Sequence, residues 1–343
     1  MVNNSLFDRA VAWFTDRQHN LRSFSMLRIL YGVGLLAMLL SSSAERALLW
    51  GHASLWVDPE AKRRGFHTFD FIFTKSSPVL FDIAFFGLIL VVALFIVGWR
   101  TRIMTFVLLV MLVSLQANNP YVLNGGDTLM RITLFFMLFA NLGEFYSLDA
   151  RRRAKQRRAG KVTRAWLPAH VSNAAHNAAL ILGCFQIIVV YVTSGVWKLL
   201  GDEWLDGTAL FYALRLDVFM AYPMVNEFIW QSSLVIYVAT FIALWVQTLF
   251  PLMLLWRPTR IFALASLIFM HLGIAVLLGL WPFSLAMIAL DMLFVRDASW
   301  VSALAWVQRS KAFNAARDAR NRAMLAMKRS ASARKAGRHK PVL

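Results

Sequence analysis

Long apolar segments, separated by short polar connections, run through most of the chain. A helix needs roughly 20 apolar residues to cross the hydrocarbon core of a bilayer, and eight segments reach or approach that length. The predicted membrane-spanning helices are residues 24–43, 80–98, 102–117, 129–145, 180–198, 234–255, 260–279 and 282–295. The pattern therefore predicts an all-α fold, a polytopic integral membrane helical bundle with about eight transmembrane helices.

Composition narrows the class of protein further. Hydrophobic residues make up 59% of the 343 residues and charged residues only 16%, whereas a soluble domain carries about a quarter charged residues. The single cysteine, Cys184, excludes an intrachain disulfide and a thiolate metal cluster. The sequence contains no phosphate-binding loop, dinucleotide fingerprint, zinc-protease motif or serine-hydrolase motif, and it predicts no metal site.

The net charge of +18 raises the question of a nucleic-acid partner, so the location of the charge matters. Much of it lies in two runs, residues 151–164 and 309–340. If the N-terminus is cytoplasmic and eight spans alternate, most lysines and arginines fall on the inner side, as the positive-inside rule requires. Both termini are therefore predicted to be cytoplasmic, with the basic segments near anionic lipids of the inner leaflet. Nucleic acid is not expected as a partner.

This topology divides the chain into three predicted segments. Residues 1–23 are expected to form an amphipathic helix on the inner leaflet. Residues 24–298 are the transmembrane domain, and residues 299–343 are a basic cytoplasmic tail. For the tail, a helix on the leaflet and a disordered segment are both open.

Lys198 stands at the outer end of the fifth predicted span, and an ionisable residue at membrane depth is a candidate for function. The residues that share its helix face are Tyr191, Ser194 and Gly195. This face is small or polar, so it should contact protein or a cavity. Burial disfavours the charged form of a lysine, and a neutral amine can act as a catalytic base. The simpler alternative is a lysine that marks the membrane interface.

The predicted outer loop between the third and fourth spans is a second candidate. Its polar and small residues are Asn118, Asn119, Asn124, Gly125, Gly126, Asp127 and Arg131. Asp127 is placed to cap a helix and to pair with Arg131 one turn later. Capping and a local ion pair explain these residues by themselves. The predicted topology nevertheless puts the loop and Lys198 on one side of the membrane, where they can line one pocket.

Further polar residues lie within the predicted spans. His271, near the middle of the seventh span, is expected to be neutral and hydrogen-bonded, and it is also a candidate pocket residue. Gln186, Gln247 and Asp291 are expected to be hydrogen-bond partners between helices. Arg28 lies about one turn inside the first span and can extend to the inner interface.

Residues 191–207 resemble a signature of the HTTM family, the membrane domain shared by vitamin K-dependent γ-glutamyl carboxylase and many short bacterial proteins, including the sporulation-delaying protein B type. Lys198 matches the second lysine of the family's lysine pair, and Trp197 stands in place of the first. Trp204 and Gly207 match the tryptophan and glycine that follow.

Two further motifs carry the resemblance, which covers residues 20–300. Residues 147–153 are similar to the family's Ser-x-Asp motif and arginine run, and residues 124–127 look like the loop of the bacterial branch. Two differences from the carboxylase limit which of its properties the resemblance implies for this chain. Pro120 follows the Asn-Asn pair where the carboxylase has a histidine, and nothing after residue 300 resembles the carboxylase's large luminal domain. Glutamate carboxylation is therefore not implied.

The resemblance implies a multi-pass protein of the bacterial inner (plasma) membrane with a quinone-related or lipid-related pocket on the outer side. By carry-over, Lys198 would be the catalytic base for a quinol of the menaquinol or vitamin K hydroquinone type, with Asp127 and Arg131 as pocket residues. A protein substrate or redox partner is expected outside the membrane. Whether this short form retains a carboxylase-like enzyme activity is open.

Two other functions are compatible with the sequence. A non-catalytic membrane protein could assist the maturation, export or anchoring of a partner protein. A transporter is disfavoured, because a transport path needs polar residues through the membrane and the inner halves of the spans are mostly apolar.

Overall fold

The computed structural model describes residues 5–54, 72–73, 77–123, 125–161, 167–309, 314–325 and 327. Within these ranges every regular element is a helix, which confirms the all-α prediction. The chain divides into two compact units, one ending at Val295 and one beginning at Arg296. The first unit contains the membrane-type helices and all the sites discussed below. The second begins with α17 (Asp297–Arg309), and of the predicted basic tail residues 310–313, 326 and 328–343 lie outside the described residues.

Four helices in the described ranges are long and apolar enough to cross a membrane by length and composition: α2 (Leu21–Ser41), α5 (Pro78–Val97), α9 (Ala169–Lys198) and α15 (Arg257–Leu277). Helices α12 (Pro223–Trp230) and α13 (Ser233–Thr248) would together make a fifth span, although they meet at a bend of 93°. Shorter apolar helices are α6 (Thr101–Ala117) and α16 (Trp281–Asp291), which η4 (Met292–Phe294) extends. A helical membrane bundle is thus confirmed, while eight spans and cytoplasmic termini stay predictions.

The limits of several helices differ from those predicted. Helix α7 covers Gly125–Met137 rather than residues 129–145, because a loop follows it. Helix α13 ends at Thr248, and α14 (Phe250–Met253) continues with Pro251 in its first turn, where proline is tolerated but cannot extend the preceding helix. The short elements are α3 (Arg46–Leu49), η2 (Pro120–Val122), α8 (Leu148–Arg158), α10 (Asp202–Leu205), α11 (Ala209–Leu214) and η3 (Asp217–Phe219).

Helix α9 begins at Ala169, well before the predicted start at residue 180. Its first turns are polar, and they hold the N-terminal segment, where α1 (Leu6–Thr15) starts with a capping box. Asn177 is fully buried and its Nδ2 donates to the backbone oxygens of Phe14 at 2.9 Å and Arg17 at 2.8 Å. The polar start of α9 is therefore a docking site for residues 5–20.

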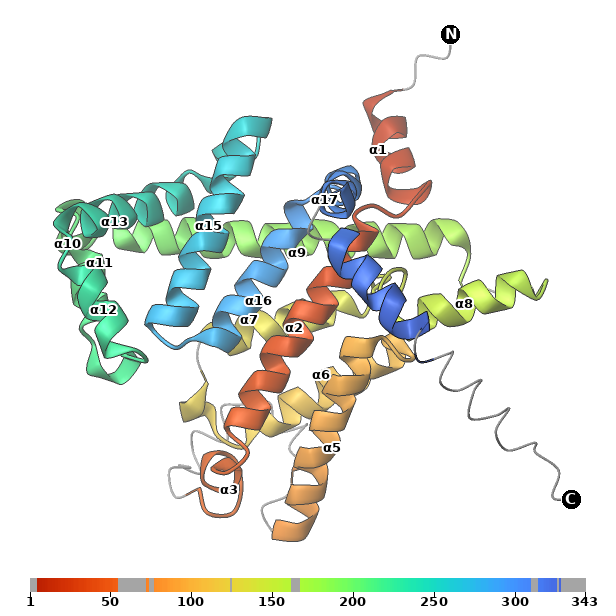
Figure 1. Ribbon diagram of the computed structural model, residues 1–343, viewed down its shortest axis with the longest axis horizontal. Helices are drawn as coiled ribbons and strands as arrows, with labels where there is room; N and C mark the ends of the chain where they lie inside the picture. Colours follow the sequence, from red (N-terminus) through yellow and green to blue (C-terminus); the bar gives the residue numbers. More distant parts are fainter. Residues whose placement is uncertain are drawn as a thin grey trace, which may run out of the picture. The chain divides into compact units, whose positions relative to one another are not determined.

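Helix α9 is the long green helix in Figure 1, and α16 packs against it. Helix α2 packs against α16 and α5, and α9 packs against α13. Gly34 allows close packing in the first of these pairs, because a Cβ there would lie 3.3 Å from the Pro282 carbonyl oxygen. Small residues at such crossings are typical of membrane bundles, where van der Waals packing drives helix association.

Arg28 is fully buried, so its side chain lies inside the bundle rather than on its surface, and its reach to the inner interface stays a prediction. Its guanidinium donates to the carbonyl oxygens of Phe95 at 2.8 Å, Leu142 at 3.2 Å and Tyr146 at 2.7 Å. Arginine has five donors in a fixed plane, and here several of them join α2 to the end of α5 and to the loop after α7.

Candidate functional site

Lys198 is the last residue of α9, and its partners come from α9 itself, from α13 and from α10. The ammonium group donates to Ser194 Oγ at 2.6 Å and to Gln247 Oε1 at 2.7 Å. The Nζ atom also lies 4.8 Å from the centre of the Trp204 ring, which is within range of a cation–π interaction. The Lys198 side chain is thus fixed by Ser194, Gln247 and Trp204 rather than extended freely into solvent.

Gly195 explains why Gln247 reaches Lys198. A Cβ at Gly195 would lie 2.7 Å from the backbone nitrogen of Thr248 and 2.8 Å from its Cα, so only glycine allows this approach of α9 to α13. Thr248 follows Gln247 directly. The close crossing therefore sets the distance across which the glutamine amide contacts the lysine.

Gly207 plays a comparable part for Trp204. Its φ of +84° lies in the left-handed region that glycine adopts at little cost. A Cβ there would also lie 2.9 Å from the Phe241 ring on α13. This turn ends the segment that carries α10, and α10 presents Trp204 to Lys198.

A second polar group lies deeper on the same face of α9, where Tyr191 is two turns from Lys198. Tyr191 OH is 2.9 Å and 3.0 Å from the two carboxylate oxygens of Asp291, and 3.1 Å from His271 Nε2. The exposed fractions of Tyr191, His271 and Asp291 are 1%, 2% and 0%. Three groups that can exchange protons thus meet inside the bundle, on α9, α15 and α16.

Proton counting constrains this group. The Tyr191 hydroxyl has one proton, so when it donates to Asp291 it must accept from His271 Nε2. The His271 ring then presents an unprotonated Nδ1, and this atom has no hydrogen-bond partner in the described structure. An orphaned polar atom in an apolar interior is costly, so moving the proton between the ring nitrogens, or bringing in a polar ligand, would change the energy of the whole group.

Helices α13 and α15 link the hydrogen-bond partners of Lys198 to the buried group that contains His271. Gln247 Nε2 donates to the Met270 sulfur at 3.3 Å, next in sequence to His271. The structure therefore brings together five of the sequence-predicted residues: Tyr191, Ser194, Lys198, Trp204 and His271. Gln247 and Asp291 were expected only as interhelical partners, and the single signal for them is a polar side chain within an apolar span.

The predicted outer-loop residues make other contacts. Asn118 and Asn119 are each 1% exposed, and their amides donate to the carbonyl oxygens of Phe73 and Leu49, both at 2.7 Å. These two amides therefore fix the backbone near Phe73 and Leu49 in place. Asn124 lies outside the described residues, and α7 begins at Gly125.

Asp127 is in the first turn of α7 and accepts from Gln116 Nε2 at 3.0 Å, while Gly126 beside it is also buried. Arg131 donates to Thr128 Oγ1 at 3.1 Å. These bonds run to α6 and within α7, whereas those of Lys198 run within α9 and to α13. That the loop and Lys198 line one pocket stays a prediction.

Lys198, Ser194 and Gln247 together offer both donors and an acceptor to a hydroxyl or carbonyl group. Such a set could orient the ring oxygens of a quinol at the membrane interface. For a metal ion, the described residues contain no group of three or more histidine, cysteine, aspartate or glutamate side chains.

Residues 16–300 match the HTTM domain family. Among known proteins, YitO of Bacillus subtilis (strain 168) is 25% identical over 283 residues, which cover 76% of this chain and 84% of YitO. Sporulation-delaying protein SdpB of the same organism is 23% identical over 203 residues, which cover 57% of this chain and 56% of SdpB. No solved structure matches the chain significantly.

Proposed function

We propose that this chain, which belongs to the HTTM domain family, binds a quinol or a lipid-like hydroxy compound beside Lys198 and takes a proton from it. One observation carries the proposal. A lysine at the end of a membrane-type helix is hydrogen-bonded to Ser194 and Gln247 and shares a helix face with the buried group of Tyr191, His271 and Asp291. Polar clusters of this kind are costly in a membrane and so indicate function.

The proposed step is a proton transfer. The neutral amine of Lys198 accepts the proton of a quinol hydroxyl, so the O–H bond breaks, an N–H bond forms, and the electron pair stays on the quinol oxygen. Ser194 and Gln247 orient the amine, and Trp204 faces the resulting ammonium across 4.8 Å. Tyr191, His271 and Asp291 are positioning residues that can hold the proton more deeply in the bundle.

A purified full-length chain in detergent, supplied with menaquinol and with O₂ as the oxidant of the deprotonated quinol, tests this role. Lys198→Ala should lower the rate of quinol oxidation by about 100-fold, within the range of general-base contributions. Lys155→Ala on the exposed face of α8 is the matched control and should leave the rate unchanged. Equal rates for wild type and Lys198→Ala reject a catalytic Lys198.

A second candidate function is a non-catalytic membrane protein that assists a partner protein. It is favoured by the large apolar side chains exposed around α12, where Val218, Met224 and Phe228 are 89%, 86% and 80% exposed. These side chains can face lipid or a protein. A quinone that co-purifies with the chain supports the first function, and a polypeptide that co-purifies in equal amount supports the second.

A further inference from the structure

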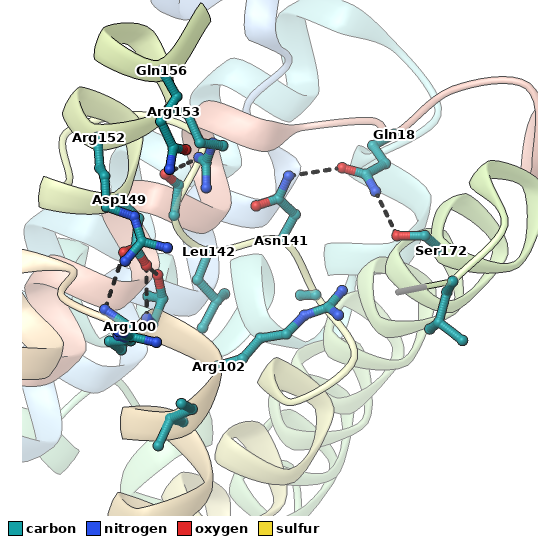
Figure 2. Close-up of a pocket in the computed structure, with 15 residues that line it drawn as sticks. Gln18, Arg100, Arg102, Asn141, Leu142, Asp149, Arg152, Arg153, Gln156 and Ser172 are labelled. Atoms are coloured by element: carbon teal, nitrogen blue, oxygen red, sulfur yellow. Dashed lines mark hydrogen bonds between the residues drawn. The ribbon is translucent and has the colours of Figure 1, made fainter. Parts of the chain in front are cut away.

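A pocket lined by arginines lies where α5 ends and α6 begins, at the other end of α9 from Lys198 (Figure 2). Its volume is about 820 Å³. The charged residues of the lining are Arg100, Arg102, Asp149, Arg152 and Arg153. Ser172 of α9 also lines it, and at 1.5 Å per residue it lies roughly 40 Å along the helix from Lys198. The pocket is therefore a separate site.

The acidic residue of this lining is already engaged. The Asp149 carboxylate accepts the backbone N–H groups of Arg100 at 3.1 Å and Thr101 at 2.8 Å, and also the Thr101 hydroxyl. Burial alone would raise the pKa of Asp149, but these bonds outweigh burial and hold it below its usual value. Asp149 thus accepts the N–H groups at the start of α6, and its charge also interacts with Arg153.

Two arginines are uncommitted. Arg153 donates to the Gly143 carbonyl oxygen and forms an ion pair with Glu144 at 3.1 Å. By contrast, Arg102 and Arg152 are exposed, and neither guanidinium forms a hydrogen bond or an ion pair with the described residues. Figure 2 shows Arg102 extending into the pocket, with Arg100 and Arg152 at one side of it.

The rest of the pocket lining carries no charge, and some of its polar side chains are hydrogen-bonded to one another. Asn141 Nδ2 donates to Gln18 Oε1 at 3.0 Å, and Gln18 Nε2 donates to Ser172 Oγ at 3.4 Å. Apolar side chains complete the lining, among them Ile103 and Leu167, which are 52% and 45% exposed. The pocket therefore offers free guanidinium groups on one side and apolar and amide groups on the others.

We infer that this pocket binds the phosphate group of an anionic phospholipid. Guanidinium groups match phosphate oxygens with paired, charge-assisted hydrogen bonds. The pocket lies at the ends of membrane-type helices and beside the highly charged α8, which is the level of lipid head groups. The exposed Ile103 and Leu167 suit the glycerol and upper acyl segments that accompany such a phosphate.

The test measures retention of phosphatidylglycerol and phosphatidylcholine by the purified full-length chain in a non-ionic detergent, with native mass spectrometry as readout. Wild type should prefer phosphatidylglycerol. Arg102→Gln with Arg152→Gln should weaken its retention about fivefold for each arginine removed. The matched control is Arg157→Gln with Arg158→Gln, which removes the same charge from exposed positions of α8 outside the lining.

Three results would overturn the inference. One is equal retention of the two lipids, and another is the same loss in the test and control variants. The third is displacement of phosphatidylglycerol by inorganic phosphate at millimolar concentration, which assigns the pocket to a soluble phosphate instead. Thermal unfolding of each variant reports on folding. The single substitution Arg102→Gln, which removes no recorded contact, provides the test if the double variant does not fold.

Discussion

The two ends of α9 carry positive charge in different ways. Around Ser172 several arginines from α6 and α8 share one pocket, and two of them are exposed and uncommitted. At the far end Lys198 stands alone, with its ammonium held by Ser194 and Gln247. A set of free guanidinium groups is suited to hold an anion, because several donors can share the oxygens of one phosphate. A single lysine with fixed partners is suited to a defined proton transfer.

The largest expected effect is on quinol turnover, and it should distinguish the Lys198 end of α9 from the arginine pocket at the other end. Lys198→Ala should reduce quinol turnover by about 100-fold, whereas Arg102→Gln with Arg152→Gln should leave turnover unchanged and reduce only lipid retention. Both variants are measured in both assays. If the arginine variant loses turnover as well, the two ends are coupled and the comparison fails.

A second effect concerns the packing that brings Gln247 to Lys198. Gly195→Val should destabilise the protein by about 1–3 kcal/mol, the usual cost of overpacking, because its Cβ would meet the backbone of Thr248. The control is Gly273→Ala on α15, where a Cβ meets nothing within 4 Å. Thermal unfolding in detergent should give a lower midpoint for the first variant and an unchanged or higher one for the second. Equal midpoints would contradict the close crossing.

A third effect concerns the N-terminal segment at the polar end of α9. Asn177→Ala removes donors to three carbonyl oxygens, those of Trp13, Phe14 and Arg17. We expect a loss of about 1–2 kcal/mol and faster proteolysis within residues 5–20. Asn173→Ala removes one recorded bond, to Thr15 O, and should show a smaller change. An unchanged proteolysis rate in Asn177→Ala would show that other contacts hold this segment.

The smallest effect is a pH dependence at the arginine pocket. Because its folded-state pKa is lowered, Asp149 contributes stability above its usual pKa of about 3.9, and this stability is lost as the pH falls through the folded-state value. The contribution should be under about 1 kcal/mol, since solvent screens this partly exposed group. Unfolding midpoints measured between pH 3 and 7 should fall at the acidic end for wild type and less for Asp149→Asn.

Asp149→Asn also sharpens the comparison between the two ends of α9. The substitution removes the one negative charge from the pocket lining while keeping a side-chain acceptor for α6. Retention of phosphatidylglycerol should therefore increase, and quinol turnover should stay the same. Decreased retention would show that the carboxylate positions the arginines rather than opposing the anion.

Much of the helical fold was predictable, because runs of apolar residues have few alternatives in a bilayer. The exceptions have physical causes. The start of α9 was missed because Asn173, His176 and Asn177 are polar, and each of them makes hydrogen bonds to carbonyl oxygens of the N-terminal segment. The early end of α7 was missed because the apolar residues after Met137 continue the pattern while the chain leaves the helix.

The candidate site divides in the same way. Helical spacing alone places Tyr191, Ser194 and Lys198 on one face of α9, since such contacts depend only on neighbours along one helix. That Gln247, His271 and Asp291 meet this face depends on three other helices, and their crossing points are set by packing between residues far apart in sequence. The sequence by itself determined a helical membrane protein with a lysine at the end of one span. Only the tertiary structure decided which buried groups that lysine joins, because each of those contacts is made between helices.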